Sequence, residues 1–156
     1  MASSYKPVGG VKRALLYPAD AVKTALFSSE GCQVQFLGIP IEVELREDKS
    51  SYEECAESSK GQVKITHTLH IVSDRDKAKR WLETDFLERA SADGVVAQVV
   101  LADDRRLLLG YSSVFGNEQP LRLESLKSTS GTTLHDRPYV ALRFVAHDTE
   151  FSCEVI

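Results

Sequence analysis

Alternation of apolar and polar residues predicts strands along most of the chain. The clearest case is the segment 62–72, where one face collects Val63, Ile65, His67, Leu69 and Ile71. A period of two indicates a strand with one buried face, because successive side chains of a strand point to opposite sides of the sheet. Similar alternation, or short apolar runs between turn residues, predicts further strands at 11–17, 41–45, 95–101, 105–111, 121–128, 139–146 and 150–156. The segment 20–27 is ambiguous, because Val22, Ala25 and Leu26 have helical spacing but the segment is short, and 34–37 is a further candidate strand.

One helix is predicted after the strand at 62–72. Ser73 begins an oxygen-bearing helix start, and apolar residues then recur at helical spacing until Gly94 provides a stop. We expect the helix at about 74–92, either continuous or recapped near Thr84 as two segments. The remaining connections are mostly of hairpin length. Because parallel strands need long crossovers, a mainly antiparallel sheet is expected.

The segment 46–61 is polar, has no period, and is longer than an ordinary hairpin connection. We expect a long loop here, because a loop of this length in a compact domain is usually functional or disordered. A mobile surface hairpin without a function is the alternative. The functional hypothesis is an assembly loop that reaches a neighbouring subunit through Asp48, Lys49, Ser50, Ser51, Tyr52, Glu53, Glu54 and Glu57.

The length of 156 residues suits a single domain over 1–156. Seven or eight short strands with one flanking helix predict a β-rich α+β fold, a mainly antiparallel sandwich or barrel. The net charge of −4 argues against tight binding to nucleic acid. No apolar run approaches the roughly 20 residues of a membrane span. Cysteines at positions 32, 55 and 153 are scattered and odd in number, so free thiols of a reducing compartment are expected.

The residues that could carry chemistry do not form a recognisable constellation. His67 and His70 are three positions apart in one predicted strand, so they point to opposite faces and cannot share a metal ion. His67 is on the apolar face and is expected to be a hydrogen-bonded core histidine. The serine-rich turn at 128–131 lacks the glycine that precedes the serine of a nucleophile elbow. We therefore expect no enzymatic activity, no cofactor and no metal.

A strand, a Ser/Thr-Gly turn and a final alternating strand follow one another in the last third of the chain: GNEQPLRLESL at 116–126, STSG at 128–131 and DRPYVAL at 136–142. This stretch resembles the C-terminal portion of tail-tube and related tail proteins of tailed bacteriophages and prophages. The resemblance implies a virion protein that assembles in the bacterial cytoplasm into hexameric rings stacked as a tube. It also implies other tail proteins as partners, the 46–61 loop crossing to the next ring, and DNA passing through an acidic lumen.

Two other classes of function stay open. A small β-barrel could bind a ligand in an apolar pocket, with His67 or Tyr111 as the polar handle. A large enclosed cavity in a monomeric protein would favour that class. An enzyme would require a pocket in which His135, His147 and an acid converge.

Overall fold

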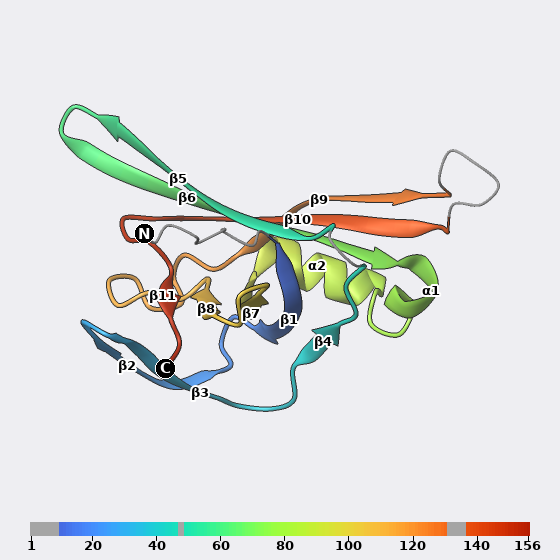
Figure 1. The fold of residues 1–156 in the computed structure, drawn as a ribbon, viewed down its shortest axis with the longest axis horizontal. Coiled ribbons are helices and arrows are strands. Elements are labelled where there is room, and N and C mark those ends of the chain that lie inside the picture. The colour runs from blue at the N-terminus through green and yellow to red at the C-terminus, as the bar shows by residue number, and fades with distance from the viewer. Residues whose placement is uncertain (1–9, 47–48, 131–136) are drawn as a thin grey trace, which may run out of the picture.

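The computed structural model describes residues 10–46, 49–130 and 137–156 and arranges them in layers of antiparallel strands (Figure 1). The described chain forms eleven strands and two helices. They are β1 (Val11–Pro18), β2 (Val22–Ser28), β3 (Gly31–Phe36), β4 (Ile41–Val43), β5 (Ser51–Ser59), β6 (Gln62–Asp74), α1 (Arg75–Ala78), α2 (Thr84–Ala92), β7 (Val95–Leu101), β8 (Arg106–Leu109), β9 (Arg122–Thr129), β10 (Tyr139–Asp148) and β11 (Cys153–Glu154). All eight strand pairings are antiparallel. The predicted β-rich α+β class is confirmed, with more strands than expected.

Two sheets and a separate hairpin account for these strands. One sheet has five strands in the order β11-β8-β7-β1-β4, and the other has four in the order β5-β6-β10-β9. β2 and β3 form a two-stranded sheet of their own. The ambiguous segment 20–27 and the candidate strand at 34–37 therefore belong to one hairpin, in which the two strands hydrogen-bond to each other.

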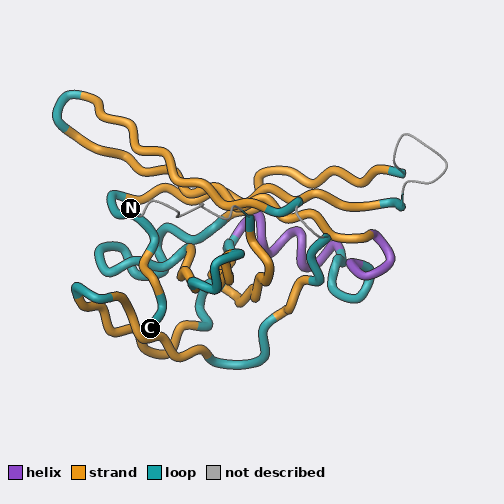
Figure 2. The backbone as a smooth tube through the Cα atoms, in the orientation of Figure 1, coloured by secondary structure: helices purple, strands orange, loops and turns teal. Residues whose placement is uncertain are grey.

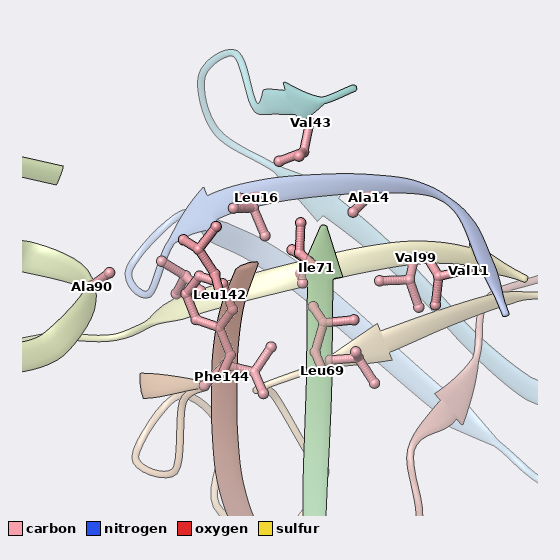
Figure 3. Packing of buried hydrophobic residues seen from close by; sticks show 14 of the residues in the cluster. Val11, Ala14, Leu16, Val43, Leu69, Ile71, Ala90, Val99, Leu142 and Phe144 are labelled. Atoms are coloured by element: carbon pink, nitrogen blue, oxygen red, sulfur yellow. The ribbon is translucent and has the colours of Figure 1, made fainter. Parts of the chain in front are cut away.

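The main core lies between the four-stranded sheet and the five-stranded sheet, with α2 beside it (Figure 3). Leu69 of β6 and Leu142 and Phe144 of β10 are fully buried and face Leu16 of β1, while Ala90 approaches from α2. Burying each large apolar side chain contributes about 1.5–3 kcal/mol. The alternation read from 62–72 is confirmed for its central residues, because this strand places one face on the core.

The region predicted as a helix at 74–92 holds two short helices, which was the second of the two expectations. Ser73 does not cap the first of them: its hydroxyl donates a hydrogen bond to the backbone oxygen of Glu44 at 2.6 Å. Asp74 holds the N-cap position of α1 without a side-chain cap bond. The second helix begins after Glu83, whose backbone is extended at φ −112° and ψ 158°. The Ser73 hydroxyl and the Asp74 carboxylate, which the sequence suggested as helix caps, are therefore hydrogen-bonded to residues elsewhere in the chain.

The expected loop at 46–61 is wrong for most of its length. Residues Ser51–Ser59 form β5, which pairs with β6 at nine positions from Ser51↔His70 to Ser59↔Gln62. The turn consists of Lys60 and Gly61, with φ values of 52° and 80°. Two consecutive residues of positive φ are the signature of a tight hairpin turn. An edge strand can be polar because much of it stays in water, so β5 shows no apolar period although β6 holds it in place.

Candidate functional site

The four-stranded sheet extends past the body of the protein on both sides (Figure 2). The β5–β6 hairpin projects on one side, and β9 and β10 project on the other. We call the side of this sheet that faces away from the core the outer face. Its residues are Ser51, Glu53, Cys55, Glu57 and Ser59 on β5, Gln62, Lys64, Thr66, Thr68 and His70 on β6, Tyr139, Ala141, Arg143, Val145 and His147 on β10, and Arg122, Glu124, Ser125, Lys127 and Thr129 on β9.

Both outermost strands of this sheet lack a strand partner along their outer edge in the described part of the chain, although Arg122 at the start of β9 donates to the backbone oxygen of Ala92 in α2 at 3.5 Å. β5 is nine residues long and β9 is eight, and no strand of the described chain pairs with the outer edge of either. The five-stranded sheet ends instead in β11, with two residues, and β4, with three. Unpaired edges present rows of backbone donors and acceptors that another strand can join. Edges of this length therefore mark the four-stranded sheet as the candidate interaction surface.

Charge changes sign from one edge of the outer face to the other. β5 carries exposed Glu53 and Glu57, whereas β9 carries exposed Arg122 and Lys127. Glu124 on β9 is an exception, and Arg143 of β10 donates to its carboxylate at 2.9 Å. The face as a whole is of mixed charge. Its acidic and basic edges are complementary to each other rather than to a polyanion.

The residues named for the assembly loop divide between the two sides of the sheet. Asp48 lies outside the described residues, and Lys49 and Ser50 precede β5. Buried Ser50 accepts a hydrogen bond from the backbone N–H of Val72 at 2.9 Å. The remaining residues alternate along β5, with Ser51, Glu53 and Glu57 on the outer face and Tyr52 and Glu54 turned toward the body.

Tyr52 and Glu54 belong to a polar network under the root of the hairpin. The Tyr52 hydroxyl lies 2.7 Å from Glu54 Oε1 and 2.6 Å from His67 Nδ1. Glu54 also accepts the backbone N–H of Ser152 at 2.9 Å and its hydroxyl proton. His67 Nε2 lies 2.9 Å from the backbone oxygen of Glu150. The expected hydrogen-bonded core histidine is confirmed, since His67 is only 5% exposed and both ring nitrogens have partners.

The proton positions in this network follow from its acceptors. The carbonyl oxygen of Glu150 can only accept, so His67 Nε2 must carry a proton. The Tyr52 hydroxyl has a single proton: either it donates to Glu54 and Nδ1 of a doubly protonated ring donates to the phenol oxygen, or it donates to Nδ1 of a neutral ring. Burial raises the pKa of Tyr52 above its ordinary value of 10.0, the Ser152 hydrogen bond lowers it, and neighbouring Glu54 raises it again. The phenol therefore stays protonated and bridges a histidine and a carboxylate.

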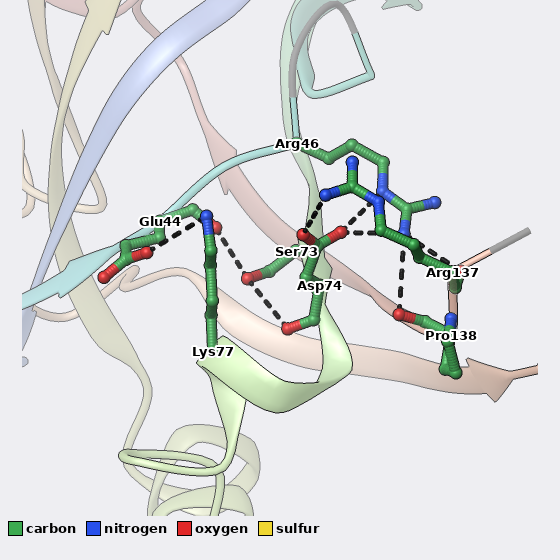
Figure 4. A network of polar contacts seen from close by, with 7 residues as sticks. All are labelled: Glu44, Arg46, Ser73, Asp74, Lys77, Arg137 and Pro138. Carbon is green, nitrogen blue, oxygen red and sulfur yellow. Dashed lines mark hydrogen bonds and ion pairs between the residues drawn. The ribbon is translucent and has the colours of Figure 1, made fainter.

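A second polar network holds the other end of the sheet (Figure 4). Arg46 donates to Asp74 through Nε at 2.8 Å and lies 2.7 Å from it through Nη2. Arg46 also donates to the backbone oxygen of Arg137 at 3.0 Å, and Arg137 Nη1 lies 3.1 Å from the same aspartate. The Arg46 guanidinium covers the Tyr139 ring at 4.9 Å. These contacts join the chain before β5 to the ends of β6 and β10, so both flanks of the sheet are anchored to the body.

The other candidate residues do not converge. His70 and His147 lie on the outer face, away from His67, and His135 lies outside the described residues. His67 and Tyr111 both line a cavity of about 460 Å³, together with acidic and hydroxyl side chains such as Asp148. Because the ring nitrogens of His67 are already engaged, a ligand there would have to be held by Tyr111 and other groups.

Sequence reasoning missed several residues of these networks. Ser152 and Glu150 contact residues of β5 and β6 that are more than eighty positions away, and Arg46 reaches Arg137 in the same way. No local signal identifies such partners.

Comparisons with protein-family models, with curated proteins and with solved structures give no match. Neither described helix has the length and apolar character needed to cross a membrane.

Proposed function

We propose that this chain is a structural protein that assembles with copies of itself by joining the β5 edge of one copy to the β9 edge of the next. The observation that carries the proposal is the strand order β5-β6-β10-β9, in which both ends of one sheet are long and free of strand partners within the described chain. Soluble monomers usually shorten, cover or charge such edges to prevent association. Here the shortened edges are those of the other sheet, and the charges on β5 and β9 are of opposite sign, so they oppose pairing of like edges and not pairing of β5 with β9.

The strand directions fit this contact. All pairings in the four-stranded sheet are antiparallel, so β5 and β9 run in opposite directions. Within one copy, Ser51–Glu53 of β5 are level with Ser125–Arg122 of β9. A second copy in the same orientation, also shifted along the strands, brings its β9 antiparallel to the length of β5, and the sheet continues without a change of pattern. The contact joins two different surfaces, so it leaves a free edge at each end of the pair. Repetition of such a contact gives a ring when the rotation closes and a filament when it does not.

Charge favours this contact over a symmetric dimer. Pairing β5 with a second β5 would place Glu53 and Glu57 of both copies side by side. Pairing β5 with β9 places them near Arg122 and Lys127 instead. Each exposed pair contributes only about 0.2–1 kcal/mol, so the charges select the partner edge while backbone hydrogen bonds and packing supply most of the association energy.

A ring built from one repeated contact agrees with what the resemblance to tail-tube proteins implies. We therefore propose that the chain belongs to a phage or prophage tail, as the tube protein or an adjoining component, assembled in the host cytoplasm with other tail proteins. Hexameric rings are the proposed state. The function is structural, and no catalytic step is assigned to it.

Cys55 provides a natural probe of the contact, because it is exposed on the outer face of β5. In a Cys32→Ser/Cys153→Ser background we add Ser125→Cys or Lys127→Cys on β9 and oxidise mildly. A ladder of covalent multimers is expected, whereas the matched control Thr24→Cys on β2 should give none. Light scattering should show multimers that grow with protein concentration. A strict monomer, or Cys55–Cys55 dimers with no ladder, would contradict the proposal.

A further inference from the structure

Two of the three cysteines lie together outside the four-stranded sheet. Cys32 is on β3 and fully buried, and Cys153 begins β11 and is partly buried. Both belong to a small apolar cluster with Val96 and Leu108, separate from the main core. Cys55 is on β5 of the four-stranded sheet and does not belong to this cluster.

The backbones on either side of the pair are in direct contact. The backbone N–H of Ile156 donates to the carbonyl oxygen of Cys32 at 2.9 Å, and Cys32 forms a parallel bridge with Val155. A Cβ atom at Gly31 would lie 2.4 Å from the backbone oxygen of Glu154. Only glycine permits this close approach between the start of β3 and the backbone of Glu154.

Cys153 and Val155 are two positions apart, so their side chains point to the same side of the chain, and Val155 is the bridge partner of Cys32. Cys153 also packs against the apolar cluster that contains Cys32. Burial raises the pKa of the Cys32 thiol to about 12, and the neighbouring Cys153 thiol raises it as well. Two neighbouring thiols, one buried and one reachable from solvent, have the arrangement in which an entering thiol reacts first and a resolving thiol closes the bond.

We infer that Cys32 and Cys153 form a disulfide when the protein meets a small-molecule disulfide oxidant such as oxidised glutathione. The bond would fasten the C-terminal strand to the β2–β3 hairpin. This inference goes beyond the proposed assembly and does not depend on it, because neither residue lies on the β5 or β9 edge. A reducing cytoplasm keeps the pair as thiols, and an oxidising exterior closes it.

The chemistry balances in two exchange steps. The Cys153 thiolate attacks one sulfur of oxidised glutathione, the glutathione S–S bond breaks, and one glutathione thiolate leaves. Cys32 then loses its proton to solvent, its sulfur attacks Cys153 Sγ, and the second glutathione thiolate leaves. Two protein thiols are oxidised to one disulfide, and one glutathione disulfide is reduced to two thiols. The second step is slow, because little of a buried thiol with a raised pKa is present as thiolate.

A closed disulfide should stabilise the fold by restricting the unfolded chain, and the effect increases with the length of the loop it closes. The loop from Cys32 to Cys153 includes most of the chain. For a domain of this size, we expect the melting temperature to rise by roughly 10 °C on oxidation and to return on reduction.

The test uses the full wild-type chain, incubated with oxidised glutathione and then blocked with an alkylating reagent. We expect peptide mapping to recover a Cys32–Cys153 link while Cys55 is alkylated or glutathionylated. The Cys55→Ser control should form the same link, and its intact mass should fall by two hydrogen atoms because no third thiol remains to be modified. In the Cys32→Ser variant, glutathione should remain attached to Cys153.

Wild-type mapping keeps the test decisive if a serine variant fails to fold. Stable glutathione adducts on Cys153 with Cys32 still reduced would overturn the inference. So would a link between Cys55 and either of the other cysteines. Because assembly is read from multimers and the disulfide from peptides of a single chain, failure of one proposal is distinguishable from failure of the other.

Discussion

Glu54 on β5 accepts the backbone N–H of Ser152 at 2.9 Å, although the two residues are 98 positions apart in the sequence. The same carboxylate receives the Tyr52 hydroxyl at 2.7 Å. One acidic side chain thus joins the root of the projecting hairpin to the segment that leads into β11. The hairpin can extend into solvent because its root is held by bonds that cross from one sheet to the other.

Replacing Glu54 with alanine should destabilise the fold by about 1–3 kcal/mol, since the Ser152 N–H and the Tyr52 hydroxyl lose their acceptor in a partly buried site. The matched control is Glu53→Ala, one position away and on the outer face, which should change stability by less than about 0.5 kcal/mol. Urea unfolding at a concentration where the chain is monomeric measures both. Equal effects of the two substitutions would mean that the network contributes nothing.

Stability should fall at alkaline pH partly through Tyr52. Its pKa in the folded protein is raised by burial above 10.0, so the folded state holds this proton more tightly than the unfolded state. The contribution of this proton to the free energy of unfolding is complete below about pH 10 and is lost as the pH rises toward the raised pKa of the folded state. The Tyr52→Phe variant should therefore lose stability less steeply than wild type between about pH 9 and pH 11. Parallel unfolding profiles over that interval would show that the phenol is not responsible.

Arg46→Lys should weaken the anchor in Figure 4 by about 1.5–3 kcal/mol. Lysine keeps the charge but cannot place two nitrogens on Asp74 while reaching the Arg137 backbone. The control is Arg13→Lys, because Arg13 also directs Nε and Nη2 at one carboxylate oxygen, that of Glu42. Both side chains of that pair are 55% exposed, so its loss should cost about 0.5 kcal/mol or less. A larger effect at position 13 than at position 46 would refute the assignment of the anchor.

The turn of the β5–β6 hairpin offers a change of stability in either direction. Lys60 has a φ of 52°, which asparagine adopts at less cost than lysine and valine at much greater cost. Lys60→Asn should stabilise the hairpin by a few tenths to about 1 kcal/mol, and Lys60→Val should destabilise it by about 1 kcal/mol or more. Amide hydrogen exchange across β5 and β6 reports both effects. Faster exchange in the asparagine variant would mean that another turn forms in solution.

Charge reversal at the two edges tests the proposed partner choice. The double variant Glu53→Lys/Glu57→Lys gives a copy with two basic edges, and Lys127→Glu gives a copy with two acidic edges, so each variant alone should assemble less than wild type. An equimolar mixture should recover assembly, because each acidic edge then meets a basic one. Sedimentation at low ionic strength measures all three samples, and added salt should reduce the difference between the variants and wild type. Unimpaired assembly of each variant alone would remove charge as the selecting factor.

Local pattern was sufficient where one face of a strand or helix is buried. The strands at 62–72 and 139–146 are predicted nearly as they occur, because burial of every second residue leaves a period that can be read directly. The strand at 95–101 is predicted from its short apolar run instead, since both of its faces pack against apolar clusters. The alternating pattern placed His67 in the core. It did not show that Glu54 and Tyr52 point toward the body and bond to His67 and Ser152, because a polar edge strand has no apolar period from which its inward face can be read.

By itself, the amino-acid sequence determined the β-rich class, the antiparallel character, the region of the helices and the inward face of β6. Only the tertiary structure decided that 51–59 is a strand, that β5 and β9 end one sheet, and that Cys32 meets Cys153. Side-chain period is a property of a single element, so it survives in the linear order of residues. Strand pairing and contacts between distant residues depend on satisfying the backbone and side chains of partners elsewhere in the chain, and that requirement is visible only when the elements are packed together.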